Sequence, residues 1–124
     1  MDPYLRAWLG AFAFTQAVEV PIWAYALAAH RRLDRDDTPW PFWLCVAVAF
    51  GASAITHPVV WFVFPRWAPG GYVAMVLQAE AFAVLVEAGY TGLLGLRRPL
   101  AWSLVANAAS AGLGLLSRAT FGWP

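Results

Sequence analysis

The stretch Tyr72–Leu94 reads YVAMVLQAEAFAVLVEAGYTGLL, an apolar run that contains two glutamates. As a helix, the run is long enough to cross a lipid bilayer. Glu80 and Glu87 are close to two helical turns apart, so both side chains project from nearly the same face, about 10 Å apart along the axis. Because hydrocarbon does not solvate carboxylates, other polar groups must cover this face. The stretch therefore predicts a transmembrane helix and an internal polar site.

The composition of the whole chain is typical of a polytopic membrane protein. Hydrophobic residues make up 61% of the 124 residues and charged residues 12%, which is about half of the charged share in an average soluble domain. A soluble domain of this size has too little interior to bury so much apolar surface. The net charge is +1, with no basic stripe, so we expect no nucleic-acid partner. The only cysteine, Cys45, cannot form an intrachain disulfide.

Four apolar segments each approach the length that spans a hydrocarbon core, at about residues 4–29, 42–64, 72–94 and 100–117. The connectors between them are short: a charged segment at 30–41, a proline- and glycine-rich turn at 65–71, and a turn around Arg97–Pro99. Short connectors make consecutive helices antiparallel. The sequence therefore predicts one all-α domain over residues 1–124, a four-helix transmembrane bundle with up-down-up-down topology. The tail 119–124 is expected to lie at the membrane interface.

The first span shares one feature with a signal peptide, because Ala26-Leu27-Ala28 mimics a cleavage site. Its apolar run is too long for a signal peptide, however, and Gln16, Glu19 and Pro21 interrupt it. We therefore expect this segment to be retained as a membrane-spanning helix.

Arginine placement predicts how the bundle is oriented in the membrane. The connectors after the first and third spans carry five arginines, and the opposite side carries three. The positive-inside rule then places these connectors in the cytoplasm and both termini on the non-cytoplasmic side of a bacterial-type inner membrane. The five are Arg31, Arg32, Arg35, Arg97 and Arg98, and the three are Arg6, Arg66 and Arg118.

Every aspartate lies in a terminus or a connector, whereas every glutamate lies within a span. Each span carries one polar face, with side chains at spacings that keep them on one side of a helix. We expect these faces to meet in the bundle. The predicted site consists of Glu19, His57, Glu80, Glu87 and Asn107, supported by Gln16, Ser53, Thr56 and Ser110.

Counting residues from the centre of each span separates the site into two depths. Glu19 and Glu87 form a predicted inner pair toward the cytoplasm, whereas His57 and Glu80 form an outer pair, with Asn107 between the two levels. Proline removes a backbone hydrogen bond within a helix. Pro21 and Pro58 are therefore expected either to free the carbonyls of residues 17 and 54 for the site or merely to shape the bundle.

Three functions fit this pattern. The leading hypothesis is the binding or relay of a cation or proton in transport. An alternative is a membrane-embedded enzyme acting on a lipid or lipoprotein, in which His57 and Glu80 hold a divalent metal ion or act as a base and its partner. No HExxH or GxSxG motif supports that alternative. The third is a non-catalytic accessory subunit that docks the transmembrane helix of a partner.

A purely structural role for the glutamates, protonated or hydrogen-bonded to Asn107 or a serine, also fits the sequence. The expected surroundings are the lipid bilayer, with a homo-oligomer or a larger membrane complex as the expected assembly, because four helices alone enclose only a narrow pathway.

Overall fold

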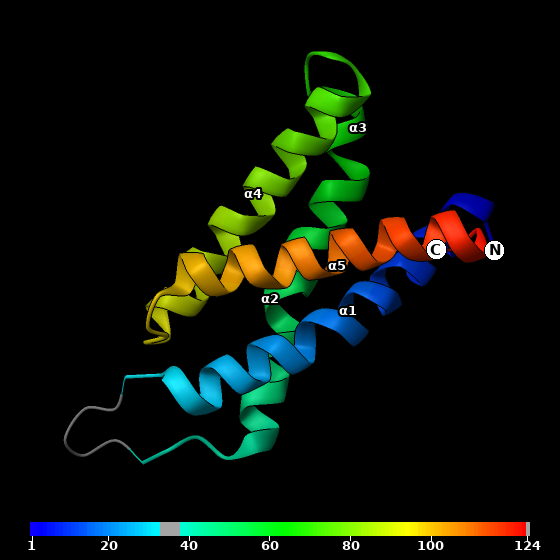
Figure 1. Ribbon diagram of the computed structural model, residues 1–124. Helices are drawn as coiled ribbons and strands as arrows, with labels where there is room; N and C mark the ends of the chain where they lie inside the picture. Colours follow the sequence, from blue (N-terminus) through cyan, green and yellow to red (C-terminus); the bar gives the residue numbers. More distant parts are fainter. Residues whose placement is uncertain (33–37, 124) are drawn as a thin grey trace.

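The computed structural model describes residues 1–32 and 38–123 (Figure 1). Its helices are α1 (Pro3–His30), α2 (Phe42–Phe62), α3 (Phe64–Trp67), α4 (Gly71–Leu93) and α5 (Pro99–Phe121). By length and hydropathy, α1, α2 together with α3, α4 and α5 each suffice to cross a membrane. The all-α fold with four spanning helices is therefore confirmed, and the chain is an integral membrane protein. The up-down order relative to a membrane stays a prediction.

Helix ends follow local chemistry, and two of them differ from the prediction. Part of the predicted turn at 65–71 is helical, because α3 continues α2 after an offset, with Pro65 in its first turn. Helix α5 extends to Phe121 instead of ending near residue 117. The Thr120 hydroxyl donates to the Leu116 carbonyl at 2.8 Å, and the helix stops only at Gly122, whose φ of 67° is left-handed.

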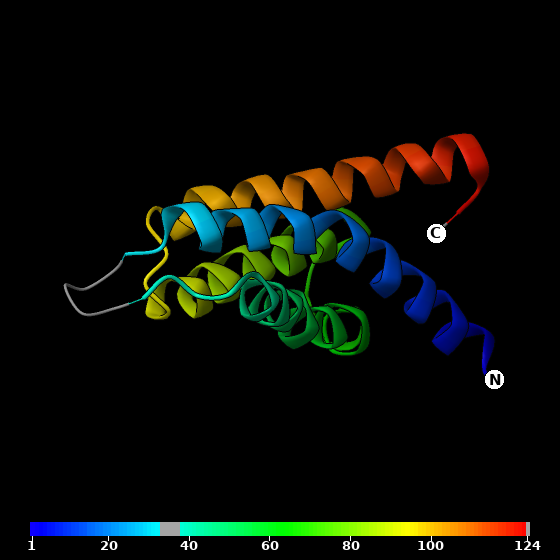
Figure 2. The ribbon, with the colours of Figure 1, turned by 90° about the horizontal axis from the view of Figure 1, so that it is seen from below.

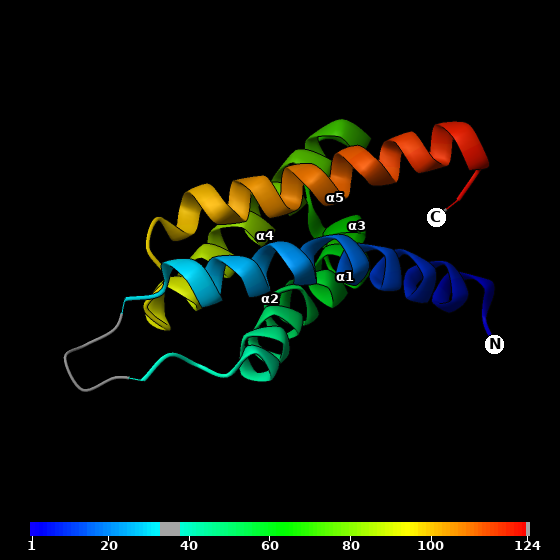
Figure 3. The same cartoon turned by 60° about the horizontal axis from the view of Figure 1, so that its bottom comes forward.

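The four long helices form a closed ring of contacts. Helix α1 packs against α2 and α5, and α4 packs against the same two helices. Within the described residues, the α1 and α4 backbones do not contact each other, and neither do those of α2 and α5. Figures 2 and 3 show α1 and α5 running together across the α2–α4 pair. The ring therefore has two diagonals, α1 with α4 and α2 with α5.

The end of the bundle that carries the connectors is filled by an apolar core. Its buried side chains come from α1, α2, α5 and the last connector, with Tyr90 of α4 packed against them, and include Trp23, Leu27, Cys45, Ala49, Leu96 and Ala106. The two arginine-bearing connectors meet here. The Arg32 N–H donates to the Gly95 carbonyl at 2.8 Å, and the Arg97 N–H to the His30 carbonyl at 3.1 Å. Arg35, which also entered the orientation argument, lies outside the described residues.

At the opposite end, the helices spread apart. In Figure 1, α1 and α5 lead to the two termini, whereas α2 and α4 lead in another direction to the α3 turn. One direct tie across this end is the Tyr4 hydroxyl, which donates to the Trp61 carbonyl at 2.7 Å. The bundle is thus tightly packed at the connector end and open between the helix pairs at the termini end.

Candidate functional site inside the bundle

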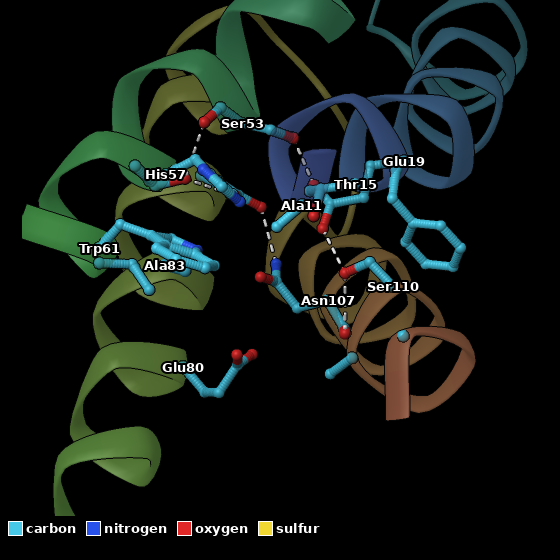
Figure 4. A pocket seen from close by; sticks show the side chains of 16 residues that line it. Ala11, Thr15, Glu19, Ser53, His57, Trp61, Glu80, Ala83, Asn107 and Ser110 are labelled. Atoms are coloured by element: carbon cyan, nitrogen blue, oxygen red, sulfur yellow. Dashed lines mark hydrogen bonds between the residues drawn. The ribbon is translucent and has the colours of Figure 1, made fainter. Parts of the chain in front are cut away.

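A cavity of about 170 Å³ lies between the four long helices, and Figure 4 shows the side chains that line it. It is large enough for several water molecules. Its polar lining contains eight of the nine residues that the sequence predicts as the site and its support, together with Thr15. Those eight are Glu19, Ser53, Thr56, His57, Glu80, Glu87, Asn107 and Ser110. Only Gln16 of the predicted set lies elsewhere.

Glu19 of α1 is held by hydroxyl groups from two neighbouring helices. Its side chain is 1% exposed. The Ser110 hydroxyl of α5 donates to Oε1 at 2.5 Å, and the Ser53 hydroxyl of α2 donates to Oε2. Both carboxylate oxygens therefore accept one hydrogen bond each, so the group is buried with its polar atoms satisfied.

Glu87 of α4 has the same arrangement with different partners. It is also 1% exposed. The Thr56 hydroxyl of α2 donates to Oε1 at 2.7 Å, and the Asn107 amide of α5 donates to Oε2 at 2.7 Å. The backbone carbonyl of Glu87 accepts from the Thr91 hydroxyl at 2.8 Å. Both the side chain and the backbone of this glutamate are thus anchored.

The two glutamates and their four donors follow the diagonals of the helix ring. The carboxylates come from α1 and α4, whose backbones do not contact each other within the described residues, and the donors come from α2 and α5. On each donor helix, the two donors are three residues apart, which places them on one face. Each glutamate therefore connects α2 with α5, and the paired donors bring the predicted inner pair, Glu19 and Glu87, together. The two glutamates and their four donors are hereafter the carboxyl cluster.

Two hydroxyl groups of the carboxyl cluster have a second acceptor within reach. Thr56 Oγ1 lies 3.3 Å from the Ser53 carbonyl oxygen, and Ser110 Oγ lies 3.1 Å from the Asn107 carbonyl oxygen. A hydroxyl carries a single proton and can accept as well as donate. Each hydroxyl can therefore donate a hydrogen bond to an ionised glutamate, or rotate toward its own helix and accept a hydrogen bond from a protonated one.

His57 and Glu80, the predicted outer pair, line the same cavity without bonding to each other. The His57 ring lies among aromatic rings, with centroids 5.2 Å from Phe12 and 6.0 Å from Trp61. Its Nδ1 is buried and has no hydrogen-bond partner. Glu80 is only partly buried. Figure 4 shows its carboxylate in the cavity, below the labelled carboxyl-cluster residues.

The metal hypothesis does not gain a third ligand from the structure. In residues 1–32 and 38–123, no group of three or more histidine, cysteine, aspartate or glutamate side chains is placed to hold a metal ion. A catalytic zinc site ordinarily has three protein ligands. His57 and Glu80 alone therefore fall short of such a site.

A second cavity, of about 270 Å³, continues from the first toward the termini end. The two share Val60, Trp61 and Glu80 as lining residues. The outer cavity is also lined by Tyr4, Tyr72 and Arg118 from the outer ends of α1, α4 and α5. The passage formed by the two cavities, from the termini end to the carboxyl cluster, is hereafter the outer route, and Glu80 lies where the two cavities meet. Among the described lining residues of both cavities, Glu80 is the only carboxylate outside the carboxyl cluster.

Gln16 has a role at a helix contact and does not line the cavity. Its amide nitrogen donates to the Phe50 carbonyl at 3.3 Å, joining α1 to α2. The predicted contribution of the carbonyls of residues 17 and 54 is not supported, since neither residue lines the cavity. Sequence reasoning also missed Trp61 and Arg118 at the outer route. Arg118 entered only the orientation argument, and no spacing rule links either residue to Glu80.

Comparison of the chain with protein-family models, with curated protein sequences and with solved structures finds no match.

Proposed function

We propose that the carboxyl cluster is a reversible proton-binding site used in proton-linked transport across the membrane, and that protons reach it from the termini end. The observation that carries this proposal is the pairing of two carboxylates, each 1% exposed, in one cluster whose four donors are neutral. Intramembrane carboxylates of this kind mark ion and proton pathways in membrane proteins.

Charge balance supports a proton or a cation as the bound species. None of the described residues that line the inner cavity is an arginine or a lysine, so no fixed positive charge beside Glu19 and Glu87 neutralises them. Two ionised carboxylates that share a small buried cluster repel each other, and sharing a proton removes that repulsion. The cluster is therefore suited to gaining and losing a proton as a unit.

The hydrogen-bond geometry favours a proton over a metal ion. Rotation of the Thr56 and Ser110 hydroxyls accommodates either protonation state without any movement of the helices, because each has a carbonyl as its alternative acceptor. A bound metal ion would instead need the carboxylate oxygens as ligands, so these oxygens would have to lose their hydrogen bonds from the four donors. The accessory-subunit alternative is less well supported, since Glu19 and Glu87 do not face lipid.

Access from one end supports a transport role. The outer route runs from the termini end past Glu80 to the carboxyl cluster, whereas the connector end is filled by fully buried apolar side chains such as Trp23 and Cys45. A site open to one side is one half of an alternating pathway. Protons would leave toward the connector end only after that core opens.

The test is proton uptake by proteoliposomes, with the single variants Glu19→Gln and Glu87→Gln and the pH read by a trapped dye. Glutamine preserves the fold, because its oxygen still accepts one hydrogen bond and its amide can donate to a hydroxyl. We expect uptake by either variant to fall to the rate of protein-free liposomes. Gln78→Ala is the matched control, since Gln78 lies on α4 but donates outside the cavity, to the Pro69 carbonyl at 2.9 Å.

Infrared spectroscopy of the same samples supplies an independent readout. A carbonyl band from protonated carboxyl groups should grow as the bulk pH falls, and should weaken in each glutamine variant. Wild-type uptake by Glu87→Gln, or a wild type whose band does not respond to pH, would overturn the proposal. A responsive band without proton uptake would retain the binding site and reject transport.

A further inference from the structure

We propose that the connector end of the bundle holds a specific site for the phosphate group of an anionic phospholipid, formed by His30, Arg97, Arg98 and Trp102. This site is separate from the carboxyl cluster and does not depend on the proposed proton function. It lies where α1 ends and α5 begins, around a cavity of about 440 Å³.

The lining of this cavity has the charge that a phosphate requires. Arg97 and Arg98 come from the α4–α5 connector and His30 from the last turn of α1, and the described lining contains no acidic side chain. Guanidinium groups bind phosphate through paired, charge-assisted hydrogen bonds. Basic pockets between transmembrane helices at the cytoplasmic side are a common mode of headgroup recognition.

The backbone that carries the two arginines is held in place, although their side chains are exposed. The Arg97 N–H donates to the His30 carbonyl at 3.1 Å, and the preceding residue, Leu96, is 3% exposed. Arg98 has a φ of 54°, in the left-handed region that favours glycine, and no other non-glycine residue in the described chain does. Backbone strain of this kind is concentrated at functional positions.

Aromatic side chains form the wall of the site toward the membrane. The His30 and Trp102 ring centroids are 5.3 Å apart, and Tyr25 lies 5.9 Å from His30 and 6.0 Å from Trp102. Tryptophan and tyrosine are the residues enriched at the headgroup level of membranes. The rings therefore place this cavity at the boundary between hydrocarbon and headgroups.

The surface next to the arginines fits acyl chains rather than water. Val105, one of the lining residues, is 52% exposed, and Leu104 beside it is 53% exposed. Further along the same end, Leu100 and Tyr25 are also exposed. A ligand with a phosphate at Arg97 and Arg98 and apolar chains along α5 matches this surface, whereas a free phosphate ion uses only its polar half. The occupant is therefore an anionic phospholipid.

The test is native mass spectrometry of the full-length protein in detergent, titrated with phosphatidylglycerol and with phosphatidylcholine of the same chains. The variant is Arg97→Gln combined with Arg98→Asn, because asparagine tolerates the left-handed conformation better than most side chains. We expect the wild type to retain phosphatidylglycerol preferentially. The double variant should bind it about 25-fold more weakly, or about fivefold for each arginine.

Two controls make the result specific. Arg6→Gln with Arg66→Gln removes the same charge at the other end of the bundle and should leave phosphatidylglycerol binding unchanged. Arg97→Lys with Arg98→Lys keeps the charge and should restore part of the binding, which shows that the site, and not the fold, was lost. Circular dichroism verifies that every variant keeps its helices.

Three results would overturn the proposal. They are equal retention of the two lipids by the wild type, an equal loss in the Arg6 and Arg66 control, and displacement of the bound lipid by millimolar inorganic phosphate. The last result would identify a site for a free anion.

Discussion

Each oxygen of Glu19 and Glu87 accepts a hydrogen bond from a different side chain, so the cluster depends on single atoms of four donors. Removing one donor leaves a buried carboxylate oxygen without its hydrogen bond. The loss of a partner for a buried charged group costs more than the hydrogen bond itself contributes. The donors are therefore the residues at which conservative changes should separate structure from function.

At Thr56, replacement by valine removes the hydroxyl at nearly constant shape, and Glu87 Oε1 loses its donor at 2.7 Å. We expect Thr56→Val to lower the free energy of unfolding by about 1 kcal/mol, because hydrogen bonds between membrane helices contribute modestly. Thr56→Ser keeps the hydroxyl and should cost less. Reversible unfolding in mixed detergent micelles measures both, and equal costs for the two variants would contradict this role of the hydroxyl.

Among the helices, the contact between α2 and α4 depends on a glycine. A Cβ atom at Gly51 would lie 2.8 Å from the Tyr90 hydroxyl oxygen, closer than real Cβ contacts allow. The same hydroxyl donates to the Val48 carbonyl at 3.3 Å. Small residues allow this close approach of helices in membranes, and Tyr90 fills the space that Gly51 leaves.

Gly51→Ala should therefore destabilise the bundle by about 1–3 kcal/mol through overpacking. Tyr90→Phe removes the clashing oxygen and should recover most of that cost, so the two changes should couple in a double-mutant cycle. The matched control is Gly89→Ala on α4, where nothing lies within 4 Å of the new Cβ. That substitution should raise stability by about 0.5–1 kcal/mol. Destabilisation of similar size at both glycines would contradict the packing explanation.

For the whole molecule, the difference between the two ends predicts accessibility from only one side. Val60 lines both the inner and the outer cavity, whereas Ala52 is 1% exposed in the core toward the connectors. In a Cys45→Ala background, Val60→Cys should react with a membrane-impermeant thiol reagent applied from the termini side. Ala52→Cys should react from neither side.

Right-side-out and inverted membrane vesicles distinguish these cases, and they also establish on which side of the membrane the termini lie. Reaction of Ala52→Cys from the connector side would show that the apolar core is open in the membrane. Protection of Val60→Cys from both sides would show that the outer route is closed there.

Composition and hydropathy alone predict the membrane class and the four spanning helices, and residue type alone singles out the polar residues of the candidate site. Hydropathy and composition act over whole segments, and the cost of a carboxylate in hydrocarbon identifies Glu19, Glu80 and Glu87 without reference to any neighbour. The helix ends at 65–71 and 117–121 differ from the prediction, since proline and glycine restrict the backbone locally but do not decide whether a turn of helix can still form.

Which residues are partners follows from the packing of the helices. Spacing placed Ser53 with Thr56 and Asn107 with Ser110 on their own helix faces, but the division of each pair between the two glutamates depends on the diagonal arrangement of the ring. Depth counting paired His57 with Glu80, whereas the structure surrounds His57 with aromatic rings. The opening at one end follows from how the helix pairs diverge, and crossing angles come from side-chain packing between helices, which no single segment encodes.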